Sequence, residues 1–286
     1  MKLGLCLAGG GVKGAAHIGV LKALAEEKIN IDYISGTSSG SIVATLYAVG
    51  YKPEEIYILF KKYCKEIKYV EVKNIIKLLI GLIFQRKIII EGLSEGKNIA
   101  KIINKACNEK NINNINQIKK PLLIPSVDLY NGKLYMFSSH KNRTTYIDEI
   151  EYIYDINIGT AVHASCSYPG VFSPCKYKNT KLIDGGIREN VPWRETKING
   201  ADKVISVVFK ENIENKKNDN IINVIANSID ILSHELSNYE LAGADYLLKI
   251  KTKEIDLLDY NKINYLYNLG YKTAKKEIDK IKKLIK

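Results

Sequence analysis

The stretch IDYISGTSSGSIVATLYAV, residues 31–49, decides the fold predicted for this chain. Residues 31–35 have the composition of a short buried strand, and apolar side chains recur at helical intervals in residues 41–49. Between them, the sequence Gly36-Thr37-Ser38-Ser39-Gly40 is typical of a tight turn that leads from a strand into a helix.

The same order of elements occurs at the start of the chain. Residues 2–8 predict a buried strand that runs into glycines, and residues 12–27 have helical spacing. Two successive strand-helix units predict a parallel sheet covered by helices. Residues 203–209 (KVISVVF) predict one more buried strand. We therefore expect an α/β fold with a central, mostly parallel sheet flanked by helices.

The rest of the chain is predicted from local patterns. Further helices are expected at residues 53–65, 93–107 and 158–167, and strands at 121–128 and 133–138, joined by an Asn131-Gly132 turn. The segment after residue 220 is predicted to be mostly helical. No repeat or clear boundary divides the chain, so residues 1–286 are expected to form one domain, with its core in about 3–200 and a helical completion in 220–286.

Composition narrows the class of protein. The chain has 286 residues, of which 46% are hydrophobic and 26% charged, as in ordinary globular proteins. Its five cysteines form no CxxC pair, which argues against a disulfide framework or a zinc site, and we expect no metal or cofactor. The N-terminal apolar run is a poor match to a signal peptide, and no apolar stretch approaches the roughly 20 residues of a spanning helix. A cytoplasmic protein is expected.

The net charge of +12 favours anionic partners such as phospholipid head groups. Basic residues are abundant along the whole chain, however, so the charge alone does not identify a partner. No zinc-finger, RNP or KH pattern supports binding to nucleic acid. The oligomeric state cannot be predicted from these features.

Ser38 is the candidate nucleophile. In the pattern G-x-S-x-G, a sharp turn projects the serine oxygen from the carboxyl edge of a sheet, and Gly36 and Gly40 leave room for neighbouring backbone. The helix that follows directs its N-terminal amides toward the place where negative charge would develop. The alternative is a Ser/Gly-rich turn in which Ser38 or Ser39 only caps the helix.

A second glycine motif, Gly9-Gly10-Gly11-Val12-Lys13-Gly14, also lies between a strand and a helix. Its spacing G-x-G-x-x-G is that of a dinucleotide-binding loop, so a nicotinamide- or flavin-dependent oxidoreductase is one alternative function. The acidic residue expected about 20 positions later is missing, because the second strand ends in Ser35 and Gly36. The loop amides are equally suited to bind an oxyanion.

Several segments together resemble the patatin-like phospholipase family over nearly the whole chain. The matching stretches are GGGVKGAAHIGVLKAL (9–24), GTSSGSIVA (36–44), ASCSYPGVFSP (164–174), DGGIRENVP (184–192) and LGYKTA (269–274). The resemblance implies a three-layer α/β/α fold and a lipid acyl hydrolase that needs no cofactor. It also implies a phospholipid or other acyl-lipid substrate, and the positive net charge is compatible with peripheral contact with an anionic membrane.

The resemblance assigns roles that the residues alone do not. Ser38 is then the nucleophile and Asp184, in Asp184-Gly185-Gly186, is its base, whereas an isolated Asp-Gly pair predicts only a turn. By the same resemblance, Gly9, Gly10 and Gly11 supply the amides of the oxyanion hole, and Gly14 completes the glycine loop. His163 stands where relatives often carry arginine, and Asn190 and Pro192 have no assigned role.

A Ser38-Asp184-His234 triad is the alternative catalytic set, as in a general carboxylesterase or acyltransferase. His234 lies in a polar, helical run, which favours a surface position. His17, one turn into the first predicted helix, is expected to be structural, and His140 lies in a polar loop.

Residues 75–84 (IIKLLIGLIF) form the most hydrophobic stretch. Two interpretations stay open. The stretch is either a buried helix or an amphipathic lid that touches a membrane, with Lys73, Lys77, Arg86 and Lys87 in or around it.

Overall fold

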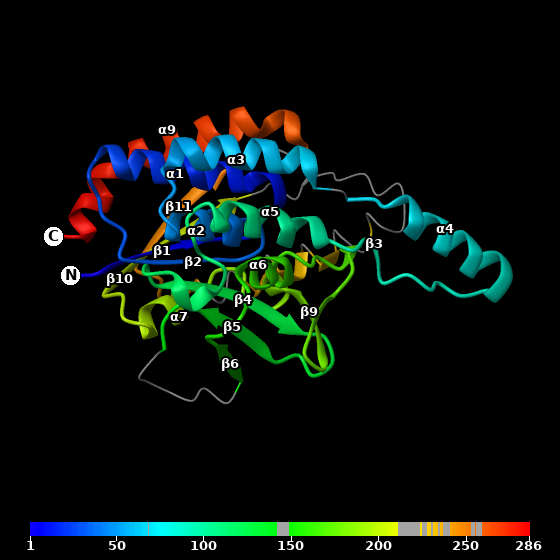
Figure 1. Ribbon diagram of the computed structural model, residues 1–286. Helices are drawn as coiled ribbons and strands as arrows, with labels where there is room; N and C mark the ends of the chain where they lie inside the picture. The colour runs from blue at the N-terminus through cyan, green and yellow to red at the C-terminus, as the bar shows by residue number, and fades with distance from the viewer. Residues whose placement is uncertain are drawn as a thin grey trace.

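The structure is a computed structural model, shown in Figure 1, and it describes the chain except for a few segments. Those outside the description are residues 68, 142–148, 211–223, 225–227, 230, 234, 237–240, 253–254 and 256–258.

A central sheet organises the molecule, with the strand order β11-β10-β1-β2-β4-β5-β6. The four pairs from β11 to β4 are parallel, β5 is antiparallel to β4, and β6 is parallel to β5. The predicted mostly parallel sheet is therefore confirmed. Its strands are β1 (Leu3–Leu7), β2 (Tyr33–Gly36), β4 (Leu122–Asp128), β5 (Leu134–Ser138), β6 (Ile150–Ile153), β10 (Lys203–Lys210) and β11 (Tyr246–Lys251).

Helices cover both faces of this sheet, as the alternation of side chains along β1 requires. Leu3, Leu5 and Leu7 face the large core under α1, α2 and α9, whereas Cys6 and Ala8 pack with Trp193 of α7 on the other face. Figure 1 shows α1, α3 and α9 together at the top of the view and α7 at the lower left. The helices are α1 (Gly14–Glu26), α2 (Ser39–Ala48), α3 (Pro53–Glu66), α4 (Val72–Ile80), α5 (Lys97–Asn108), α6 (Ile158–Ser165), α7 (Trp193–Ile198) and α9 (Ile263–Leu284).

The C-terminal helix α9 lies directly against the backbone of α1. A Cβ atom on Gly270 would lie 1.9 Å from the carbonyl oxygen of Ala16, and one on Gly19 would lie 2.0 Å from that of Tyr267. Such distances are far below van der Waals contact, so both helices need glycine at the crossing. The C-terminal segment is thereby fixed to the helix that follows the glycine loop.

Strand β9 (Thr180–Asp184) brings a distant part of the chain to the carboxyl end of β2. Along β4, Ser35 of β2 is paired with Leu123, and Asp184 of β9 is paired with Ser126. β9 therefore occupies the position beside β4 that β2 leaves when its chain turns away after Gly36. This register places Asp184 just beyond the end of β2, where Ser38 lies.

Three segments differ from their predictions. Helix α5 begins at Lys97, because residues 92–94 form β3, which pairs with β7 (Gly170–Phe172). The C-terminal segment contains the edge strand β11 as well as helix. The buried-helix interpretation of residues 75–84 is wrong, since Leu79 is 51% exposed and Phe84 is 79% exposed.

Candidate active site

The turn around Ser38 has the backbone of a strained elbow. Ser38 has φ 51° and ψ −123°, a conformation that non-glycine residues rarely adopt. A Cβ atom on Gly36 would lie 2.4 Å from the Gly40 carbonyl oxygen, and one on Gly40 would lie 2.3 Å from that of Leu7. The two glycines thus permit the sharp turn, and Ser38 sits immediately before the N-terminus of α2.

Hydrogen bonds to two other segments hold this elbow in place. The Ser38 amide donates a hydrogen bond of 3.0 Å to Ser165 Oγ at the end of α6. The neighbouring Thr37 Oγ1 donates one of 3.0 Å to the carbonyl oxygen of Glu189. Neither Ser165 nor Thr37 was singled out from the sequence, although Ser165 lies in the stretch ASCSYPGVFSP that matches the family.

The Asp184 side chain is 2% exposed, and only one of its two carboxylate oxygens accepts a hydrogen bond from a described residue. Its Oδ1 accepts a 2.8 Å hydrogen bond from the Gly186 amide. Its Oδ2 is buried and forms no hydrogen bond with any residue that the structure describes. Burial raises the pKa of Asp184 to about 7, while the Gly186 amide and the nearby Ser38 hydroxyl lower it. Asp184 therefore offers a carboxylate of raised basicity beside Ser38.

The first glycine loop lies against the elbow, and its amides are not equivalent. The Gly9 amide donates a 2.8 Å hydrogen bond to Asn190 Oδ1, and a Cβ atom on Gly9 would lie 3.2 Å from Ser38 Cβ. The amides of Gly10 and Gly11 have no hydrogen-bond acceptor within the described part of the chain. Of the three predicted oxyanion donors, Gly9 thus already has a partner, while the other two stay available.

His17 contacts the residue that precedes this glycine loop. It is fully buried, its Nε2 lies 2.8 Å from the carbonyl oxygen of Ala8, and burial lowers its pKa to about 4. A neutral His17 protonated on Nε2 donates to Ala8, the residue before Gly9. The structural role predicted for His17 is confirmed.

The remaining histidines bear on the triad alternative. His163 is buried and its Nε2 donates to the Glu95 carbonyl at 3.1 Å, whereas His140 Nδ1 lies 2.8 Å from Ser139 Oγ. Neither of them bonds Asp184. His234 lies outside the described residues, but its neighbour Ser233 donates a 3.1 Å hydrogen bond to the Gly186 carbonyl oxygen.

The other predicted glycines have structural positions around these groups. Gly14 begins α1 and packs against Ser39, and Gly185 would clash with the Pro125 carbonyl oxygen, 2.4 Å away, if it carried a Cβ atom. Within the described ranges, no three His, Cys, Asp or Glu side chains are grouped in a way that would hold a metal ion. None of the described helices has the length and apolar character needed to span a membrane.

The strained serine elbow, the buried carboxylate and the glycine loop all lie within the part of the sequence that a known family shares. The Patatin-like phospholipase pattern matches residues 5–197. The chain belongs to the patatin-like phospholipase family. Membership of this family indicates a hydrolase that acts on ester bonds.

Curated relatives and solved structures agree with a patatin-like fold. Lysophospholipase NTE1 of Meyerozyma guilliermondii is 30% identical over 205 residues, and NTE1 of Candida albicans is 29% identical over 206. Each alignment covers 72% of this chain but only 12% and 13%, respectively, of the much longer relative. VipD from Legionella pneumophila has a similar fold, with a TM-score of 0.55 and 14% identity over 98% of this chain and 67% of VipD.

Another solved structure has the same fold. The ExoU–SpcU complex of Pseudomonas aeruginosa contains a chain that matches with a TM-score of 0.51 and 18% identity. The match covers 98% of this chain and 51% of the other one. At such low identities the two structures confirm only the fold, which is the α/β arrangement expected from the resemblance.

Asn190 lies in the patatin-like motif and has no role that sequence reasoning assigned, but its contact with the Gly9 amide predicts that it positions the glycine loop. Asn190→Ala removes the acceptor of the Gly9 amide, so the glycine loop should lose its alignment with Ser38. We expect kcat to fall about 10- to 100-fold with little change in KM, because oxyanion contacts act mainly in the transition state. Steady-state kinetics on a soluble ester measure this effect.

Asn190→Asp is the matched control for that experiment. It keeps an acceptor oxygen for Gly9 and adds a negative charge near the Asp184 carboxylate, since both side chains approach Gly186. Most of the kcat should return at high pH, and the pH at which activity falls should move upward. Wild-type kcat in Asn190→Ala would contradict the role assigned to this contact.

Proposed function

We propose that this protein is a serine lipid acyl hydrolase that uses a Ser38-Asp184 dyad to cleave carboxylic ester bonds of phospholipids or lysophospholipids. The observation that carries the proposal is the buried Asp184 carboxyl, whose Oδ2 is open beside the strained Ser38 elbow. A pKa of about 7 matches both parts of general acid-base catalysis, since the group can accept and return a proton near neutral pH.

In the first step, Asp184 Oδ2 accepts the Ser38 hydroxyl proton as Ser38 Oγ attacks the ester carbonyl carbon. The carbonyl oxygen becomes an oxyanion, and the amides of Gly10 and Gly11, which have no acceptor among the described residues, donate to it in this proposal. The positive end of the α2 dipole adds further stabilisation at the same place.

In the second step, the tetrahedral intermediate collapses and the C–O bond to the alcohol breaks. Asp184 returns its proton to the leaving alkoxide, which departs as an alcohol and leaves an acyl group on Ser38. Asp184 then removes a proton from water, which attacks the carbonyl carbon of the acyl-enzyme. As the bond between that carbon and Ser38 Oγ breaks, Asp184 returns the proton to Ser38 Oγ, which releases the fatty acid and restores both residues. Every proton is therefore carried by one carboxyl group.

The substrate and location are part of the same proposal. The family name and the lysophospholipase relatives support an acyl lipid as substrate, and the net charge of +12 supports peripheral contact with an anionic membrane. A cytoplasmic location is supported by the five cysteines, all free and buried. Residues 1–286 are proposed to work as one domain, because β11 extends the sheet and α9 packs on α1.

A panel of phospholipid, lysophospholipid and triacylglycerol substrates tests the proposal. We expect fatty acid release from at least one of them and a mass increase of one acyl group on the peptide that contains Ser38. The control is His234→Gln, which should retain activity within a few-fold if Asp184 is the base. A loss of 100-fold or more in a folded His234→Gln protein would instead support the Ser38-Asp184-His234 triad. No release from any of the lipids would contradict the proposed substrate class.

A further inference from the structure

Residues 70–90 form an arm that projects from the body of the molecule. It consists of α4 (Val72–Ile80), one π-helical turn (Gly81–Gln85) and a returning segment that ends at β3. Figure 1 shows the arm extending well beyond the sheet and the helices that cover it. An element that leaves the core in this way needs another surface to cover its apolar side chains.

The arm carries an exceptional share of exposed apolar surface. More than half of the large hydrophobic side chains that are exposed among the described residues lie in it. Their spacing of three and four residues gives one continuous helical stripe, made up of Val72, Ile75, Ile76, Leu79, Ile80 and Ile83. Ile83 is 69% exposed and Phe84, at the outer turn, is 79% exposed. Large exposed patches of this kind mark interaction sites.

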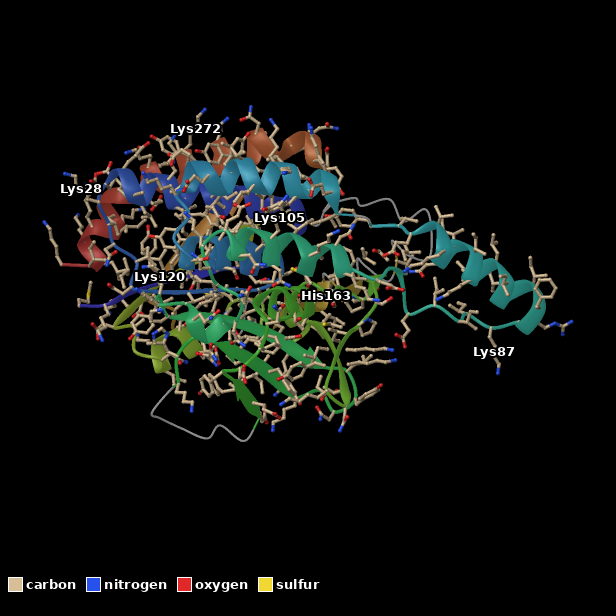
Figure 2. The ribbon with its side chains drawn as sticks, in the orientation of Figure 1. Lys28, Lys87, Lys105, Lys120, His163 and Lys272 are labelled. Atoms are coloured by element: carbon tan, nitrogen blue, oxygen red, sulfur yellow. The ribbon has the colours of Figure 1, made fainter. Side chains whose placement is uncertain are left out.

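The charges of the arm differ between its base and its outer part. At the base, Lys73 is paired with Glu71 at 3.0 Å and with Glu95 at 2.7 Å. Farther out, the exposed cations Lys77, Arg86 and Lys87 have no acidic partner in the described ranges. Figure 2 shows Lys87 projecting from the returning segment toward solvent. The outer part of the arm therefore combines exposed apolar side chains with charged side chains that are all basic.

The base of the arm is tied to the helix that holds the active-site elbow. Glu71 Oε1 accepts hydrogen bonds from Ser94 Oγ at 2.9 Å and from the Glu95 amide at 2.8 Å, which joins the two ends of the arm. The Glu95 carbonyl in turn accepts the bond from His163 of α6. Ser165, two residues later on α6, accepts the Ser38 amide. The arm is thus anchored close to the catalytic serine.

We infer that the arm docks the enzyme on anionic membranes, with its apolar stripe in the interfacial region and Lys77, Arg86 and Lys87 among the head groups. The choice of a membrane as occupant rests in part on the proposed lipid substrate. It rests also on charge complementarity, because a second copy of the chain would bring the same unpaired cations together. Anionic phospholipids supply both the apolar and the negative surface that the arm lacks.

The test uses vesicles of phosphatidylcholine mixed with phosphatidylglycerol, and Ser38→Ala protein so that the vesicles stay intact. Leu79→Asp combined with Ile83→Asp should weaken vesicle binding by about 100-fold, since each buried apolar side chain contributes about tenfold or more. The control is Ile58→Asp on α3, where an isoleucine that is 66% exposed receives the same change outside the arm. Ile58→Asp should bind like its parent.

A second variant removes the positive charges of the arm and leaves its apolar stripe unchanged. Lys77→Gln, Arg86→Gln and Lys87→Gln together should weaken binding to the mixed vesicles by about 100-fold, at about fivefold per charge. Binding to pure phosphatidylcholine should change little. If the aspartate variant fails to fold, this comparison decides the matter.

The outcomes separate the arm from the chemistry. Unchanged vesicle binding by both arm variants would overturn the inference, as would a dimer that the arm variants convert to a monomer without loss of vesicle binding. With wild-type Ser38, the arm variants should hydrolyse a short soluble ester at the normal rate. Arm-dependent binding by a protein that hydrolyses no ester would overturn the proposed function and still support the arm.

Discussion

Replacement of Ser38 by alanine is expected to lower ester hydrolysis by about five to six orders of magnitude, to the level that binding and the oxyanion donors alone provide. The loss should be this large because Ser38 Oγ is the atom proposed to form the acyl-enzyme. Among the described residues, no other hydroxyl occupies the strained position immediately before α2. The variant should also fail to react with a fluorophosphonate probe, which labels only activated serines.

The neighbouring serine gives a matched control for this prediction. Ser39 Oγ is buried without a hydrogen-bond partner among the described residues, so Ser39→Ala should keep both activity and probe labelling. Labelling is measured by mass spectrometry of the peptide that contains both serines, and thermal unfolding verifies that each variant is folded. A labelled, active Ser38→Ala protein would show that the nucleophile lies elsewhere.

Asp184→Asn is expected to lower kcat by about 10²- to 10⁴-fold, because it removes the only base proposed for the reaction. The amide retains an acceptor for the Gly186 N–H, so local geometry should be conserved. Since burial raises the pKa of Asp184 to about 7, the wild-type kcat should rise with pH up to about 7 and then level off. The variant should lack this rise. A wild-type rate that is flat between about pH 5 and pH 8 would contradict Asp184 as the base.

The Asp184 carboxyl should lower the stability of the fold over the same pH range in which it raises kcat. Its pKa rises from 3.8 to about 7 on folding, so the folded state holds the proton more tightly and stability falls as pH rises through 7. Asparagine does not titrate. The unfolding free energy of Asp184→Asn relative to wild type should therefore increase by on the order of 4 kcal/mol between pH 4 and pH 8. Chemical denaturation at the two pH values measures this difference, and equal differences at both would contradict the buried, titrating carboxyl.

Much of the fold followed from local sequence. The strands at residues 2–8 and 203–209 and the Asn131-Gly132 hairpin are confirmed, because dense apolar runs and turn residues specify them locally. Strand β11 was missed, since only Leu248 and Ile250 are buried in it and its basic residues resemble the surrounding helices. The short β3 and β7 could not be predicted, because each depends on pairing with the other, almost 80 residues away.

The exposure of the arm could not be predicted from the composition of its sequence either. An apolar run such as residues 75–84 has the same sequence whether it is covered by the protein or by something else, and only the position of α4 outside the body distinguishes the two. The buried state was the more ordinary expectation for so hydrophobic a segment.

The candidate site divides in the same way. The turn around Ser38 and the glycine loop could be located because steric and dihedral requirements restrict their residue types. Asp184 required the family resemblance, because an Asp-Gly pair predicts only a turn. The contacts of Asn190 with Gly9 and of Ser165 with Ser38 span 181 and 127 residues, respectively. No local pattern reports contacts of that range, although both residues lie in stretches that match the family.

Strands β2 and β9 both pair with β4, and this limits where insertions and deletions can occur in the sequence. Asp184 faces Ser38 only while its pairing with Ser126 holds, and successive residues of a strand point to opposite sides of a sheet. Loss or gain of a single residue in β9, or between Leu123 and Ser126 of β4, would turn the carboxylate away from the serine even if the fold survived. Insertions and deletions that preserve catalysis should therefore be confined to the connecting loops, because a change of two residues in a strand would restore the facing of the carboxylate but move it about 7 Å along the strand.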